Sequence, residues 1–188
     1  MLPTIAWHED DIVMVDQRKL PATEVYVTCG NINDVAKAIK TMVIRGAPAI
    51  GVCAAMGLAL GASRTKATGT KQFTTEFQKN CDVLAATRPT AVNLFWAIER
   101  MKHTFSDGAL AGESVDQLKA RLRIEADRIH DDDVASWEAD WSALSLRTGL
   151  MWTREAANTV YRPIRSIWST PAPTGSSGAA GLKGSSTA

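Results

Sequence analysis

The chain has 188 residues, 45% of them hydrophobic, and its 21 basic and 20 acidic residues give a formal net charge of +1. This length suits one ordinary domain, or one domain with an appendage, and the apolar content is enough for a sizeable core. A nearly balanced charge argues against a dedicated nucleic-acid surface or a polybasic membrane surface. We therefore expect neither nucleic acid nor membrane among the partners.

The lack of a recognisable signal peptide and the pattern of cysteines predict a cytoplasmic protein. The N-terminal stretch is acidic early and has no apolar secretory core, so no signal peptide is expected. The three cysteines, Cys29, Cys53 and Cys81, are odd in number, widely spaced and without a CxxC pair. This pattern predicts reduced, mostly buried thiols in a cytoplasmic protein.

The first part of the chain predicts a small antiparallel sheet. Three short strands are expected at 5–8, 12–17 and 24–29, and the connections between them are too short for parallel crossovers. Asn31, with Asp34 three positions later, is typical of a helix N-cap. The helix that follows has one apolar stripe, made of Ile32, Val35, Ala36, Ile39, Met42 and Val43.

An apolar run at 47–63 predicts a buried helix. It has no charged residue, and it is shorter than the roughly 20 residues that a membrane span needs. Gly57 and Gly61 lie four positions apart in it. Such a small-residue pair indicates close packing against neighbouring helices.

Three further helices are expected before residue 136. The first spans 73–87 and is broken at 88–90, because the residue before a proline avoids the helical region. The second starts at Ala91 and ends at Asp107-Gly108. Ser114 and Gln117 form a capping box that opens the third.

These elements define an α+β fold class that is mainly helical, with a small N-terminal antiparallel sheet followed by a helical bundle. From about Ser136 the apolar residues no longer recur at helical spacing, and residues 169–188 are almost entirely Ser, Thr, Pro, Gly and Ala. We therefore expect two parts, a domain at 1–135 and a poorly ordered, irregular tail at 136–188. The residues predicted to be largely buried are Val35, Ile39, Ile50, Leu58, Phe77, Phe95, Leu122 and Ile129.

An arginine-glycine turn links the first helix to the apolar helix. Arg45 is expected at the C-terminal end of the first helix, with Gly46 as its left-handed stop and Pro48 in the first turn of the next helix. The new helix then opens with free N–H groups beside a guanidinium, which together predict a phosphate-binding site. From the residues alone, an ordinary cationic helix end with a glycine cap is an equally good interpretation.

Arg88 is the second candidate, since it also stands just before a predicted helix and can present a planar fork to phosphate oxygens. From spacing alone, each arginine would more often be a solvated surface charge.

No metal site is expected. His8, His103 and His130 have no metal-ligand spacing, and the adjacent carboxylates 131–133 point in different directions on a helix, which favours a solvated helix end.

Three segments together resemble one family. VIRGAPAIG, the opening IAWHEDDIVMVDQRKLP and the later TRPTAVNLFWAIERM are similar to methylthioribose-1-phosphate isomerases, the aldose–ketose isomerases of methionine salvage. The resemblance covers about residues 4–135 and then stops. It implies that Arg45, Gly46, Ala47 and Arg88 bind a phosphorylated sugar, methylthioribose 1-phosphate, with no cofactor.

The resemblance also implies what this chain lacks. The family's catalytic cysteine motif and its acid/base aspartate belong to a C-terminal Rossmann-like domain, and no matching segment is present. We therefore expect no catalytic residue here, and a truncated, inactive form of the isomerase. A change of reading frame near Ser136 would explain the abrupt stop.

Two other interpretations stay open at this point. The regulatory subunits of the translation-initiation guanine-nucleotide exchange complex are similar to the same family and act as non-catalytic scaffolds. A small dimerisation module without a ligand is the third interpretation, and a homodimer is compatible with the sequence. The continuation Ala47–Gly51 after Arg45-Gly46 favours the isomerase branch.

Overall fold

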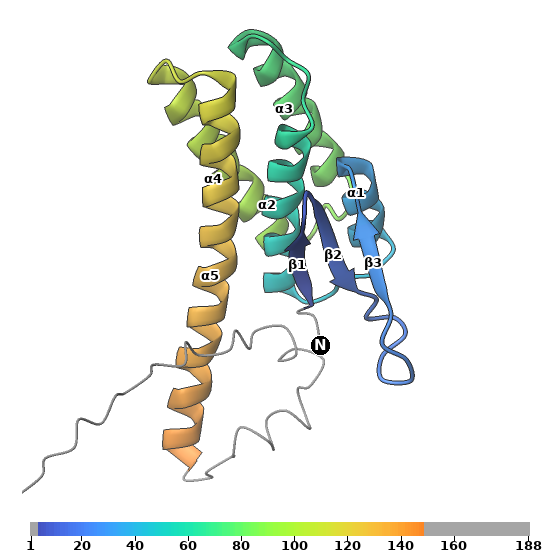
Figure 1. Ribbon diagram of the computed structural model, residues 1–188. Coiled ribbons are helices and arrows are strands. Elements are labelled where there is room, and N and C mark those ends of the chain that lie inside the picture. Colours follow the sequence, from blue (N-terminus) through green and yellow to red (C-terminus); the bar gives the residue numbers. More distant parts are fainter. Residues whose placement is uncertain (1–3, 149–188) are drawn as a thin grey trace, which may run out of the picture.

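A computed structural model describes residues 4–148 (Figure 1). In this part of the chain, a short sheet packs beside a bundle of helices. The strands are β1 (Ile5–His8), β2 (Asp11–Val15) and β3 (Tyr26–Cys29), and the helices are α1 (Ile32–Lys40), α2 (Ala47–Ser63), α3 (Thr70–Ala85), α4 (Val92–Leu110) and α5 (Val115–Thr148). The predicted fold class, mainly helical with a small N-terminal sheet, is confirmed.

The sheet is antiparallel throughout, in the order β1-β2-β3. Ile5 pairs with Met14, and Ile12 pairs with Cys29; all four side chains are buried. This apolar face lies against the helices, and α2 contacts β2 while α1 contacts β3. The end of β2 is thereby fixed close to the segment that leads into α2.

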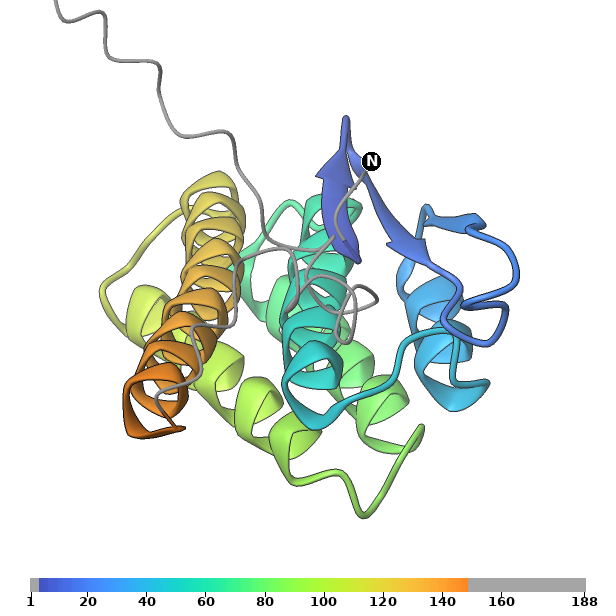
Figure 2. The same ribbon diagram turned by 90° about the horizontal axis from the view of Figure 1, so that it is seen from below.

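Helix α2 runs through the middle of the bundle (Figures 1 and 2). It contacts all four other helices and β2, and nearly every side chain from Ile50 to Leu60 is buried. The prediction of a buried core helix is confirmed. Among the described residues, no helix combines the length and the apolar character that crossing a membrane requires.

The two glycines of α2 allow the neighbouring helices to approach closely. A Cβ atom on Gly57 would lie 2.7 Å from Cγ1 of Val35 on α1, and one on Gly61 would lie 2.7 Å from Nδ2 of Asn80 on α3. Both distances are shorter than van der Waals contact allows. The predicted close packing at this pair is confirmed.

We expect Gly57→Val to destabilise the protein by about 2–3 kcal/mol, because the added methyl groups must displace the branched side chain of Val35 within a close-packed core. Urea unfolding followed by circular dichroism measures the effect. The matched control is Gly69→Val, where no atom lies within 4 Å of an added Cβ and the cost should stay below about 1 kcal/mol. Equal losses in the two variants would contradict the packing role.

The link between α1 and α2 differs from the prediction. Helix α1 ends at Lys40, and the left-handed residue that follows is Met42, with φ 60°. Residues 41–45 form a loop in which Val43 and Ile44 are buried, so Arg45 lies in this loop and not at the end of α1 as predicted. Gly46 was wrongly predicted as the stop of α1; with φ 95° it is the N-cap of α2, a conformation that strongly favours glycine. Pro48 lies in the first turn of α2, as predicted.

Helix α4 passes through its predicted stop at Asp107-Gly108 and ends at Leu110, with Gly112 (φ 75°) just beyond. A Cβ atom on Gly108 would lie 2.6 Å from both Glu113 and Leu118. The absence of a side chain at position 108 therefore serves packing against the following segment, and Gly112 provides the turn.

Phe95 is the one wrong member of the predicted core, since 37% of its surface is exposed. The buried stripe of α4 consists of Leu94, Ala97, Ile98, Met101 and Phe105. Phe95 lies one position past Leu94, which turns it away from that stripe. The other seven predicted core residues are buried.

Helix α5 begins with the predicted capping box. Ser114 N–H donates to Oε1 of Gln117 at 2.8 Å, and Gln117 N–H donates to Oγ of Ser114 at 3.3 Å. The helix continues across Ser136 to Thr148, so the proposed boundary at 135 falls inside a helix. The carboxylates at 131–133 therefore lie within the helix, not at its end. The rest of the predicted tail, 149–188, lies outside the described residues.

Candidate anion-binding site

Helices α2 and α4 begin at the same end of the bundle. An added Cβ on Gly51, one turn into α2, would lie 3.1 Å from the carbonyl oxygen of Asn93, in the first turn of α4. The view from below shows these two helix starts side by side (Figure 2). Arg45 precedes α2 and Arg88 precedes α4, so the fold brings both predicted site residues to this end. Their sharing of one phosphate stays a prediction.

The first half of the site is the start of α2. In α2, no side chain caps the first turn and no acidic residue lies in it. The positive end of the helix is therefore uncompensated, and Gly46, Ala47 and Pro48 at its start are exposed. Pro48 has no N–H, so the Ala47 N–H is the first free donor of the helix. Gly46 has no side chain that would cover it.

Arg45 is fixed in place by Gln17. The Arg45 backbone N–H donates to Oε1 of Gln17 at 2.9 Å, and its Nη2 donates to the Gln17 carbonyl oxygen at 2.9 Å. The Arg45 side chain is otherwise exposed, so its remaining N–H donors are free to bind a ligand. Sequence reasoning missed Gln17, because the two residues are 28 positions apart and no local pattern joins them.

The second half is the start of α4. The carbonyl oxygen of half-buried Arg88 accepts the N–H of Ala91 at 3.0 Å, which closes the turn before the helix. Here too, no side chain caps the helix and no acidic residue lies in the first turn. Within the described part of the chain, the Arg88 guanidinium takes part in no ion pair. Arg88 therefore combines a free charge with a second positive helix end.

A pocket of about 450 Å³ opens between the starts of α2 and α4 and the middle of α5. Its apolar wall comes from Pro48, Val92 and Trp96. Its polar wall contains Asp132 and Asp133, and burial raises the pKa of the Asp133 carboxyl. The pocket adjoins the helix starts, and its wall is apolar on one side and acidic on the other.

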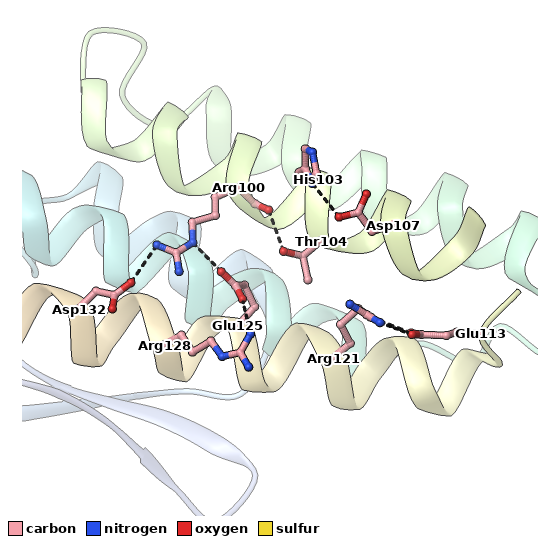
Figure 3. Close-up of polar contacts among 9 residues, drawn as sticks. All are labelled: Arg100, His103, Thr104, Asp107, Glu113, Arg121, Glu125, Arg128 and Asp132. Atoms are coloured by element: carbon pink, nitrogen blue, oxygen red, sulfur yellow. Dashed lines mark hydrogen bonds and ion pairs between the residues drawn. The ribbon is translucent and has the colours of Figure 1, made fainter. Parts of the chain in front are cut away.

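Arg100 neutralises part of that acidic wall. Its Nε lies 2.5 Å from Oε1 of buried Glu125, and its Nη1 lies 3.0 Å from Oδ2 of Asp132 (Figure 3). Arg128 also contacts Glu125, at 3.5 Å. These ion pairs link α5 to α4. Because Arg100 already pairs with two carboxylates, it is not available to bind an anion.

The cysteines are all free and buried. Burial raises the pKa of Cys29 to about 11 and that of Cys81 to about 12, and it raises the pKa of Cys53 as well. A thiol with such a pKa stays protonated at neutral pH and is a poor nucleophile. The prediction of buried thiols is confirmed. In the described residues, no group of three or more His, Cys, Asp or Glu side chains is arranged to hold a metal ion.

The model of the initiation factor 2 subunit family matches residues 43–145, and the chain belongs to that family. Its relatives include proteins named methylthioribose-1-phosphate isomerase. Those of Geobacter metallireducens and Koribacter versatilis are 52% and 48% identical to this chain over 136 and 139 residues. The matches cover 72% and 74% of this chain, but 39% of each relative, so the chain spans well under half the length of these isomerases.

Solved structures agree with both branches of the resemblance. The 5-methylthioribose 1-phosphate isomerase of Pyrococcus horikoshii is similar with a TM-score of 0.67 and 38% identity, over 70% of this chain and 36% of that one. The delta subunit of translation initiation factor eIF-2B from A. fulgidus is similar with a TM-score of 0.65 and 37% identity, over 71% of this chain and 38% of that one. The predicted resemblance to the isomerases and to the exchange-factor subunits is confirmed.

Proposed function

We propose that this chain supplies the sugar-phosphate-binding part of a methylthioribose-1-phosphate isomerase of methionine salvage, and that it works in the cytoplasm. Arg45, Gly46, Ala47 and Arg88, called the anion site below, hold the phosphate of methylthioribose 1-phosphate. The observation that carries the proposal is the juxtaposition of two uncapped helix starts, each led by an arginine without an acidic partner. Relatives of that name at about half identity support the choice of substrate.

The anion site binds and orients rather than reacts. Guanidinium forks and helix N–H groups complement the oxygens of a phosphate dianion, and both favour negative charge. Isomerisation between C1 and C2 of the sugar also needs an acid/base group in contact with the substrate. Among the described residues, the thiols are buried and Asp132 pairs with Arg100, which leaves the Asp133 carboxyl in the adjoining pocket as the candidate acid/base group. We infer that the isomerisation also uses residues beyond those described, because one carboxyl does not supply both the acid and the base.

A non-catalytic regulatory subunit is the second candidate, favoured by the similarity to the eIF-2B delta subunit. That structure and the isomerase structure match this chain almost equally well, so the fold alone does not separate them. The continuation Ala47–Gly51 and the names of the sequence relatives favour the isomerase.

Thermal unfolding of the full chain with and without methylthioribose 1-phosphate tests the proposal. A ligand that binds only the folded state at 100 times its dissociation constant adds about 2.7 kcal/mol of stability, which raises Tm by several degrees. Unphosphorylated methylthioribose should not raise Tm. If the two compounds act alike, or neither acts, the phosphate-binding function is wrong and the regulatory candidate is preferred.

A further inference from the structure

Asp16, Gln17 and Arg18 form a hydrogen-bonded turn directly after β2. Asp16 is 2% exposed, and its carboxylate accepts from Nε and Nη2 of Arg18 at 2.8 and 2.7 Å and from the Arg18 backbone N–H at 3.1 Å. The Asp16 N–H donates to the carbonyl oxygen of Val25 at 2.7 Å. Both sides of Gln17 are thereby fixed. The hydrogen bonds from Arg18 hold the pKa of Asp16 below its ordinary value, so the pair stays charged at neutral pH.

Gln17 joins this turn to the loop before α2 by three hydrogen bonds. Its backbone N–H donates to the carbonyl oxygen of Val43, its Oε1 accepts from the Arg45 N–H, and its carbonyl oxygen accepts from Nη2 of Arg45, each at 2.9 Å. The loop contains the left-handed Met42 and the positive-φ Gly46, and neither belongs to a regular helix or strand. Arg45, at the end of this loop, is thus held by a residue of the turn that follows β2.

We propose that Gln17 is the positioning residue of the anion site, which holds the backbone and guanidinium of Arg45 at the start of α2 before a ligand arrives. This inference rests on the proposed function. An exposed arginine loses rotamer freedom when it binds a phosphate, and a side chain that is already held loses less. The Gln17 carbonyl engages one Nη2 N–H and leaves the other donors of the guanidinium to the phosphate.

The test compares Gln17→Ala and Gln17→Glu with a matched control, Gln78→Ala. Gln78 lies on the surface of α3 and donates to Asp82 at 2.8 Å, so its loss also removes one glutamine hydrogen bond. Gln17→Ala removes the acceptor of the Arg45 N–H but keeps the backbone bond to Nη2. Gln17→Glu restores an acceptor of the same length.

The first readout is hydrogen exchange of the Arg45 amide in the full chain, measured by NMR without ligand. Exchange should be at least about tenfold faster in Gln17→Ala, return toward the wild-type rate in Gln17→Glu, and be unchanged in Gln78→Ala. A merely structural role would instead speed exchange throughout the domain. Unchanged protection of Arg45 in Gln17→Ala overturns the positioning role.

The second readout is affinity for methylthioribose 1-phosphate by calorimetry. Gln17→Ala should bind about 3- to 10-fold more weakly than the wild type, the usual effect of one neutral hydrogen bond. If Arg45→Ala weakens binding while Gln17→Ala binds like wild type, the proposed function stands and this inference falls. If the wild type does not bind at all, the proposed function falls, and the exchange readout still decides whether Gln17 holds Arg45.

Discussion

Purified alone and supplied with methylthioribose 1-phosphate, the 188-residue chain is expected to form no measurable ketose 1-phosphate over several hours. The anion site can position a substrate, but positioning accelerates only a reaction whose catalytic group is present. General acid/base catalysis contributes about 10²–10⁴-fold, and preorganised electrostatic stabilisation often contributes more. Among the described residues, the thiols are buried and protonated, and the pocket beside the helix starts offers one unpaired carboxyl, Asp133, as a candidate acid/base. We do not expect this single carboxyl to carry both proton transfers of the isomerisation.

The assay must separate this chain from the expression host. Protein produced in a strain without its own isomerase is incubated with substrate, and the ketose product is followed by a coupled enzyme or by NMR. A full-length relative, such as the isomerase of Geobacter metallireducens, serves as the positive control. Turnover by the chain that persists in the deletion strain would refute the assignment of a binding role without chemistry.

A second part of the same assay asks whether the anion site is useful to a partner. Because the chain spans 39% of its isomerase relatives, the remaining portion of such a relative can be produced as a separate polypeptide and added in excess. Restored turnover would indicate that the described domain retains its binding geometry. Such rescue would leave the prediction for the isolated chain intact.

The elements that the sequence predicted well are those specified by local physics. The apolar, uncharged run of α2 has no stable place other than a core, and its glycines can only be explained by close neighbours. The Ser114–Gln117 box satisfies the free N–H groups of a helix start within four residues. Burial and capping of this kind need no knowledge of the remainder of the chain.

The errors arose where tertiary contacts override local signals. Gly46 looks like a helix stop in sequence, but the left-handed residue after α1 is Met42, and Val43 and Ile44 follow it as buried residues of a loop. Phe95 has the character of a core residue, and only the rotation of α4 against the bundle turns it outward. A propensity or a hydrophobicity pattern cannot contain this information.

The candidate site was predictable in part. Arg45 and Arg88 were found because each precedes a helix, and the motif resemblance joined them. That α2 and α4 start at the same end of the bundle depends on the close approach of Gly51 to Asn93, a long-range contact. The hold of Gln17 on Arg45 is equally long-range, and so is the network in which Arg100 engages Glu125 and Asp132 (Figure 3).

The second large effect concerns the two arginines. We expect Arg45→Ala and Arg88→Ala each to weaken binding of methylthioribose 1-phosphate by about 1.5–3 kcal/mol, the contribution of a charge-assisted hydrogen bond. Calorimetry on the full chain measures the change. The control is Arg64→Ala, since Arg64 caps the opposite end of α2 and pairs with Asp11 at 2.8 Å. Its removal should leave affinity unchanged.

The double variant then decides whether the two arginines hold one phosphate. Two groups that bind the same phosphate are coupled, so removing both should cost less or more than the sum of the single losses by at least about 0.5 kcal/mol. Additive losses would mean that Arg45 and Arg88 act on separate parts of the ligand. If Arg45→Ala and Arg88→Ala bind methylthioribose 1-phosphate as tightly as Arg64→Ala does, neither Arg45 nor Arg88 contacts the ligand. In that case the uncapped starts of α2 and α4 would be features of the fold, without a role in binding.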